Sequence, residues 1–158
     1  MKKAVIVIDA IKGMEKWVPA SRMKKILPNI KKVLDKARAK KIPLIYIVHT
    51  PLGKKGTIIY DTIKPAKGER KIFKKKYSSF YNTSLDKTLK KMRVKRLVLT
   101  GVSTHWCVLA TALDAHYRDY KITILKDCVT APTEKDHRLA LDWLEGTIDM
   151  TLASSKRW

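Results

Sequence analysis

Short apolar runs rich in branched side chains recur along this chain, and they alternate with segments that carry helix signals. Such runs are typical of strands covered on both faces, as in a parallel sheet. Strands and helices that alternate in this way indicate an α/β fold, a three-layer α/β/α arrangement of the Rossmann-like class with a mostly parallel sheet. The runs that we predict as strands are residues 4–8, 43–48, 94–100, 122–125 and 148–153.

Helices are predicted between these runs, over residues 28–40, 84–92, 103–117 and 133–144. Pro28 suits a first helical turn, Ser84 is placed to cap its helix, and Gly146 is expected to end the last one. One side of that last helix collects the apolar residues Leu139, Ala140, Trp143 and Leu144.

The segment 49–71 contains three glycines, two prolines and no clear periodicity, which predicts a long loop. Loops of this length in compact domains are often functional. No repeat, low-complexity tail or linker interrupts the pattern, so we expect residues 1–158 to form a single domain.

The formal net charge of +21 raises nucleic acid as a partner. The lysines, however, are spread over nearly every segment, and the densest run, residues 71–76, is interrupted by apolar residues. No zinc-finger, RRM or KH motif occurs. The chain has no Gln and only two Asn residues, and a Lys-rich, amide-poor composition is a thermophile pattern. We therefore do not expect nucleic acid as a partner.

Cysteine content and hydropathy bear on the compartment. Two cysteines do not make a disulfide framework, and no apolar run approaches the roughly 20 residues of a membrane span. The apolar N-terminal stretch lacks a small-residue cleavage site and continues into Asp9, which favours a buried strand over a signal sequence. We expect a cytoplasmic protein that does not bind membranes.

Three reactive residues fall at predicted carboxyl ends of strands, where parallel sheets bind ligands. Cys107 follows a predicted strand and a glycine turn and lies at the start of a predicted helix. At such a position, unpaired N–H groups and the helix dipole favour the thiolate. Asp9 ends the first strand, and Lys74 lies in a short apolar patch before Tyr77. Lys74 would lower the pKa of the thiol and Asp9 would accept its proton, as nucleophilic catalysis requires.

Each of these residues also has a plain structural interpretation. Cys107 could be a buried core cysteine, Asp9 could cap the loop after its strand, and Lys74 could be one more solvated lysine. For Cys128 we expect a packing role, and for His137 a structural hydrogen bond.

Two sequence motifs are distinctive enough to carry a resemblance to a known family. They are Lys-Lys-Lys-Tyr-Ser-Ser-Phe at residues 74–80 and Gly-Val-Ser-Thr-His-Trp-Cys-Val-Leu-Ala-Thr-Ala at residues 101–112. With them the chain resembles the isochorismatase-like cysteine hydrolase superfamily, which includes nicotinamidases, N-carbamoylsarcosine amidases and isochorismatases. Further matching residues run in order through the chain: 5–9, 28–30, 37–38, 42–46, Asp127 and 134–137.

The resemblance implies a catalytic triad of Asp9, Lys74 and Cys107 that hydrolyses a small-molecule amide through a thioester on Cys107, with no cofactor. Lys74 is chosen over its two neighbours because the family lysine stands three residues before the motif tyrosine. The resemblance also implies a cis peptide bond between Val102 and Ser103. The N–H groups of Ser103 and Cys107 would then form an oxyanion hole. Family members commonly form dimers or tetramers, so we expect a homo-oligomer.

The chain departs from the family pattern at positions that concern the substrate. Ile11 stands where many members have Gln, which removes a polar group from the expected site floor. Nicotinamidases bind a metal through an Asp-x-His pair and a further His, but only His49 follows the second strand here, with Asp61 too far along. We therefore predict no catalytic metal and do not expect nicotinamide as substrate. The 49–71 loop is also shorter than in typical members.

We assign substrate binding to four residues near the reactive ones: Trp17, Tyr77, His105 and Trp106. Trp17 and Tyr77 could instead belong to the core, and Trp106 could face a partner subunit. Two other functions stay open. One is a thiol-independent vinyl ether hydrolase of the isochorismatase type, and the other is a non-catalytic basic binding module. The presence of all three reactive residues favours the amidase.

Overall fold

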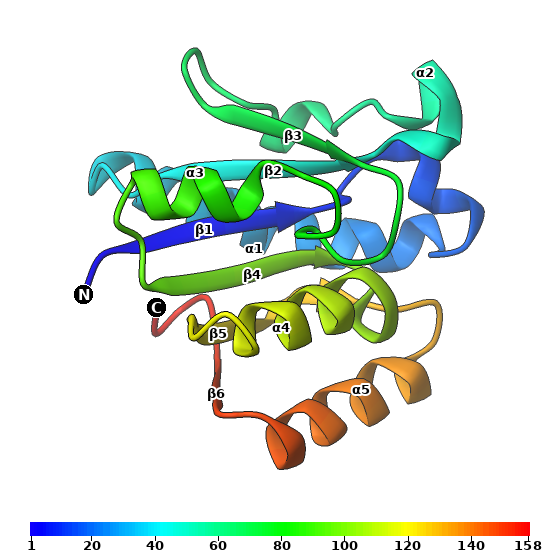
Figure 1. The fold of residues 1–158 in the computed structure, drawn as a ribbon. Helices are drawn as coiled ribbons and strands as arrows, with labels where there is room; N and C mark the ends of the chain where they lie inside the picture. Colours follow the sequence, from blue (N-terminus) through cyan, green and yellow to red (C-terminus); the bar gives the residue numbers. More distant parts are fainter.

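The computed structural model describes residues 1–158 and contains one six-stranded sheet with the order β3-β2-β1-β4-β5-β6 (Figure 1). Every neighbouring pair of strands is parallel, which confirms the predicted fold class. The strands are β1 (Lys3–Ile8), β2 (Leu44–His49), β3 (Arg70–Lys74), β4 (Arg96–Val102), β5 (Lys121–Thr130) and β6 (Met150–Ala153).

Helices cover both faces of this sheet (Figure 1). One face packs against α1 (Ala20–Ala39), and the other against α3 (Leu85–Lys91), α4 (Leu109–His116) and α5 (Glu134–Thr147). Because side chains alternate across a strand, β1 sends Val5 and Val7 into the core under α1, and Ile6 and Ile8 into the other core. No helix has both the length and the apolar character needed to cross a membrane.

The strand order reverses direction at β1. The chain moves from β1 outward to β2 and β3, and then crosses to β4 on the other side of β1. In open parallel sheets, ligands bind at such a switch point, outside the carboxyl ends of the strands. The turns that follow β1 and β4 are η1 (Lys12–Lys16) and the π-helical turn η4 (Thr104–Val108).

One predicted helix start is wrong, and a second is right in position but lacks the expected capping hydrogen bond. Pro28 lies inside α1, which begins at Ala20, because Met23 and Ile26 extend the buried stripe of the helix toward the N-terminus. Ser84 precedes α3 as predicted, but its side chain makes no capping hydrogen bond. The Leu85 N–H donates instead to Thr83 Oγ1 at 3.2 Å.

The last helix also differs from its prediction. It continues through Gly146 to Thr147. Leu139 and Trp143 are 57% and 49% exposed, so they do not belong to the buried side of α5. Ala140 and Leu144 are buried as predicted, and Leu141 joins Leu144 in the core with helix α4 and the sheet.

The predicted loop 49–71 is partly ordered into short elements: η2 (Thr50–Leu52), α2 (Gly53–Gly56) and η3 (Asp61–Ile63). Ile59 forms a single antiparallel bridge with Ile11, which holds the segment against the end of β1. Ile11 is fully buried in this contact. The loop ends earlier than predicted because β3 begins at Arg70 and carries Lys74 on an edge strand.

Gly101 in β4 yields a sharp prediction about stability. Its φ is +105°, and a Cβ there would lie 1.9 Å from the Ile8 carbonyl oxygen. We expect Gly101→Ala to lower the free energy of unfolding by more than about 3 kcal/mol or to prevent folding, as measured by guanidinium denaturation. The matched control is Gly146→Ala in α5, where nothing lies within 4 Å; it should stabilise by up to about 1 kcal/mol. A Gly101→Ala protein of native stability would contradict this.

Candidate active site

The structure brings the three reactive side chains predicted from the sequence into contact. Asp9 directly follows β1, Lys74 ends β3, and Cys107 lies in η4 after β4. The Lys74 Nζ atom is 2.8 Å from Asp9 Oδ2 and 3.2 Å from Cys107 Sγ. The side chains of Asp9 and Lys74 are completely buried, and Cys107 is 4% exposed. The arrangement is therefore an ion pair, removed from solvent, that touches a thiol.

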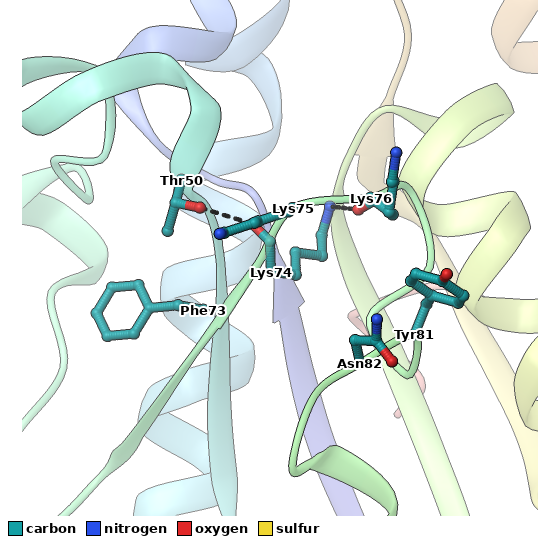
Figure 2. Close-up of a pocket in the computed structure, with 7 residues that line it drawn as sticks. All are labelled: Thr50, Phe73, Lys74, Lys75, Lys76, Tyr81 and Asn82. Carbon is teal, nitrogen blue, oxygen red and sulfur yellow. Dashed lines mark hydrogen bonds between the residues drawn. The ribbon is translucent and has the colours of Figure 1, made fainter.

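Lys74 is held at this point by more than its ion pair. Its ammonium also donates to the Lys76 carbonyl oxygen at 2.9 Å, and its own carbonyl accepts from Thr50 Oγ1 (Figure 2). An ammonium has three N–H donors, and the three contacts of Lys74 use all of them. Lys75 and Lys76 are exposed, so the structure places the first lysine of the motif, and not its neighbours, in this pair.

Asp9 occupies an unusual backbone position for a residue with a side chain. Its φ is +47°, a left-handed conformation that Asp adopts more readily than most residues. Its N–H donates to the Ile47 carbonyl oxygen at 3.0 Å, which ties the turn to β2. Oδ1 is buried and accepts no hydrogen bond in the protein. One carboxylate oxygen therefore stays available to take a proton.

The thiol of Cys107 is not pre-ionised. Burial, reinforced by the neighbouring Asp9 carboxylate, raises the pKa of Cys107 to about 12, although Lys74 acts in the opposite direction. The prediction that this junction favours the thiolate is therefore wrong. Desolvation disfavours the charged form, and it outweighs the nearby ammonium because Asp9 already neutralises that charge.

This raised pKa has a measurable consequence. Alkylation of Cys107 by iodoacetamide should accelerate about tenfold per pH unit from about pH 7 to about pH 11, because only the thiolate reacts. Peptide mass mapping after timed quenching gives the rate. The same protein in guanidinium chloride serves as the reference, since its thiols should titrate near about 8.5. A rate that levels off below about pH 9 in the native protein would contradict the buried-thiol assignment.

The turn that precedes Cys107 is tightly organised. The Val102–Ser103 peptide bond is cis. The Ser103 carbonyl accepts hydrogen bonds from the N–H groups of both Trp106 and Val108, at 3.0 and 3.1 Å. The Ser103 N–H has no acceptor within the backbone. The backbone on either side of Cys107 is therefore fixed to one carbonyl group.

Two residues were predicted to have structural roles, His137 and Cys128. One contacts this turn and the other lies in the core. His137 on α5 contacts Thr104 Oγ1 through Nδ1 at 2.9 Å, which confirms its predicted hydrogen bond. Cys128 is fully buried in the core under α1, away from the cavity at Cys107. Both side chains therefore support the fold around the site.

A cavity of about 380 Å³ opens onto Cys107. Three of the residues predicted to bind substrate line it, namely Trp17, Tyr77 and Trp106. The rings of Tyr77 and Trp106 are nearly parallel, 9° apart, with centroids separated by 6.4 Å. His105 is not part of the wall. It stacks on Trp106 at 4.4 Å and contacts Ser103 Oγ at 3.0 Å, so it orients the tryptophan from behind.

Two further residues line this cavity, Met14 and His49. Ile11 is not among the lining residues, so it does not form the expected floor. Met14 had no sequence signal, since an apolar residue in a short turn is indistinguishable from core. The position of His49 directly after the predicted strand 43–48 was the available signal, because parallel strands end at the same edge of the sheet.

A second hollow, of about 430 Å³, lies along the segment that carries Lys74 (Figure 2). Its wall contains Lys74 together with Phe73, Lys75 and Tyr81, but not Cys107. Of the three reactive residues, only Lys74 borders this hollow, so it does not give access to the thiol.

Nearly the whole chain matches a known domain: the isochorismatase domain model covers residues 3–154. This chain belongs to the isochorismatase family. Within that family, it is 31% identical over 163 residues to the protein YaaI of Bacillus subtilis, covering 92% of this chain and 90% of YaaI.

Solved structures of isochorismatase-like proteins share the fold. The isochorismatase-like hydrolase from Alkaliphilus metalliredigens has a TM-score of 0.90 at 28% identity, covering 99% of this chain and 96% of that one. The N-carbamoylsarcosine amidase from Thermoplasma acidophilum has a TM-score of 0.87 at 26% identity, covering 98% and 97%. The resemblance found in the sequence is confirmed, and this isochorismatase-family chain is a hydrolase.

His49 does not belong to a metal-binding cluster. No group of three or more His, Cys, Asp or Glu side chains is placed to hold a metal ion. At the cavity, His49 is accompanied by apolar and aromatic side chains and by the thiol. The residues present in this isochorismatase-family chain therefore do not fit a nicotinamidase-type metal set.

Proposed function

We propose that this protein hydrolyses the C–N bond of a small amide through a thioester on Cys107. The observation that carries the proposal is the contact of one buried ammonium, Lys74 Nζ, with both Asp9 Oδ2 and Cys107 Sγ. Such a group orients a proton acceptor and a nucleophile against each other at the base of a cavity. The similarity to a protein named N-carbamoylsarcosine amidase supports the choice of a C–N bond.

Acylation begins from the neutral thiol. The Cys107 proton passes to Asp9 as Sγ attacks the carbonyl carbon of the amide, so the thiolate forms only in the reacting complex. The tetrahedral intermediate then collapses with cleavage of the C–N bond. Asp9 returns its proton to the departing nitrogen, which leaves as the amine. The acyl group remains on Cys107 as a thioester.

Deacylation uses the same groups in reverse order. Water attacks the thioester carbonyl while Asp9 takes one of its protons, and collapse of the intermediate releases the carboxylic acid. Asp9 then returns the proton to Cys107 Sγ, which restores the starting state. Throughout, Lys74 keeps Asp9 and Sγ in place and stabilises the charge that moves between them.

The developing oxyanion needs hydrogen-bond donors near Cys107. We assign this role to the N–H groups of Ser103 and Cys107, and each such donor is worth about 3 kcal/mol in the transition state. The assignment is supported by the bonding of Ser103, whose carbonyl holds the N–H groups on either side of Cys107.

We further propose that the protein acts as a homo-oligomer in the cytoplasm. Both cysteines are unpaired and buried, which suits a reducing compartment. The wall residues Trp17 and Tyr77 are 41% and 59% exposed, so the cavity mouth has apolar surface that a partner subunit could cover.

The covalent intermediate provides the direct test. The protein is incubated with a panel of primary amides, with hydroxylamine added as a competing nucleophile. We expect carboxylic acid and hydroxamate to form together, and acid-quenched protein to carry the acyl mass on the Cys107 peptide and not on the Cys128 peptide. Turnover with no hydroxamate and no acylated Cys107 peptide would overturn the thioester mechanism.

A further inference from the structure

The cavity in front of Cys107 contains no unpaired charge. Its wall consists of apolar, aromatic and neutral polar side chains: Met14, Trp17, His49, Tyr77, Trp106 and Cys107. Asp9 and Lys74, the charged pair next to Cys107, do not line the cavity, and they lie 2.8 Å apart and neutralise each other. Lys16 lies over the ring of Trp17, 5.4 Å from its centroid, but it does not itself line the cavity. A charged substrate would lose its hydration here without a counter-charge in the wall, which is strongly unfavourable.

Two polar side chains of the wall already have a role: Cys107 is the proposed nucleophile, and Tyr77 stacks on Trp106. His49 has neither kind of role. It ends β2, opposite Lys74 in the parallel register. Its Nδ1 is buried without a hydrogen-bond partner. Burial, followed by the charge of Lys74, lowers the pKa of His49, so the ring is neutral near pH 7 and offers one N–H donor and one acceptor.

His49 lines the cavity, and of its two ring nitrogens Nδ1 is the buried one without a partner. An unpaired N–H is tolerated less well than an unpaired lone pair. The ring proton is therefore best placed on Nε2, and Nδ1 keeps the unshared pair. His49 can then donate a hydrogen bond to whatever occupies the cavity.

The aromatic part of the wall favours a flat ligand. Tyr77 and Trp106 are nearly parallel, and His105 fixes the tryptophan by stacking on it while contacting Ser103 Oγ. Flat groups pack well on such ring faces. The volume of about 380 Å³ lies at the small end of the range for small-molecule sites.

We propose that the substrate is an uncharged amide whose flat acyl group carries a hydrogen-bond acceptor, and that His49 is the specificity-determining residue that binds this acceptor. The inference rests on the amidase function proposed above. It goes beyond that function because it excludes carboxylate-bearing amides, although the chain as a whole is strongly cationic.

The charge selection is tested with near-isosteric amides. The 3- and 4-substituted benzamides that carry an acetyl group, an isopropyl group or a carboxylate differ in one property at a time. We expect kcat/KM for the better acetyl isomer to exceed that for its carboxylate counterpart by at least about 100-fold. If the carboxylate is preferred while Cys107 is still acylated, this inference fails and the amidase function stands. If none of the amides acylates Cys107, the proposed function fails, and this inference fails with it.

The role of His49 is tested on the same compounds. His49→Phe keeps a flat ring without a donor, and we expect it to lower kcat/KM for the acetyl compound by about 10- to 100-fold, mainly through KM. The isopropyl compound should be unaffected. His49→Gln should restore much of the loss because the amide can donate. The control is His116→Phe on α4, outside the cavity.

Equal losses on the acetyl and isopropyl compounds would show that His49 has only a structural role, and would overturn its assignment. Thermal unfolding of each variant, together with its Cys107 acylation, establishes that the site is assembled. If His49→Phe does not fold, His49→Leu, which also lacks a donor, takes its place in the same comparison. A loss on the acetyl compound alone supports the donor role, and an equal loss or no loss on both compounds contradicts it.

Discussion

Replacement of Cys107 by Ala should lower turnover by at least about 1,000-fold and leave the fold intact. Cys107 supplies the only thiol on the cavity wall, so its loss removes the covalent route entirely. The buried volume that is lost is small, and we expect a change in the free energy of unfolding of about 1 kcal/mol. Product formation under saturating amide, with circular dichroism for the fold, gives both quantities.

The matched control is Cys128→Ala. Both cysteines are unpaired and buried, but Cys128 packs in the core under α1. Cys128→Ala should lower the free energy of unfolding about as much as Cys107→Ala does, and it should leave turnover unchanged. If Cys107→Ala retained near-native turnover, the thioester mechanism would be wrong, and a thiol-independent hydrolysis of the vinyl ether type would become the better account.

Lys74→Met should abolish turnover and also destabilise the protein, by about 3–5 kcal/mol. The reason is that Asp9 would remain fully buried with no counter-charge, since its side chain has no other partner in the protein. Denaturant unfolding of the variant at neutral pH measures this loss. Lys75→Met is the matched control, because Lys75 is the exposed neighbour in the same motif, and it should change neither property appreciably.

A double variant separates stability from catalysis in this pair. Asp9→Asn combined with Lys74→Met removes both charges, so most of the lost stability should return while turnover remains absent. If Lys74→Met alone were as stable as the wild type, Asp9 would not depend on its ammonium partner. If the double variant regained activity, neither residue would belong to the reacting group.

The strands differ in how readily the sequence reveals them. The buried strands β1, β2 and β4 were predictable because both of their faces are covered, and such strands appear as continuous apolar runs. The edge strand β3 was missed as a strand because only alternate residues, Ile72 and Lys74, are buried and three of its five residues are basic. The second half of β5 was missed because Lys126 and Asp127 interrupt its apolar run.

The same contrast holds for helices. Periodicity located α1 and α5, but it did not reveal that α1 passes through Pro28 or that α5 exposes Leu139 and Trp143. Helical spacing predicts which residues lie on the same side of a helix. Which side then packs against the sheet depends on how the helix is rotated by its neighbours, and that is a tertiary contact.

In the site, the sequence by itself determined which residues we propose for the reaction. Asp9, Lys74 and Cys107 each follow a strand or belong to a specific motif, and parallel strands present their carboxyl ends at one edge of the sheet. Only the tertiary structure decided the direction in which the pKa of the thiol is shifted and the place of His49 in the cavity wall. Both depend on how deeply a group is buried and on which charges surround it. Those surroundings come from segments far apart in the chain, so they exist only once the strands have assembled into the sheet.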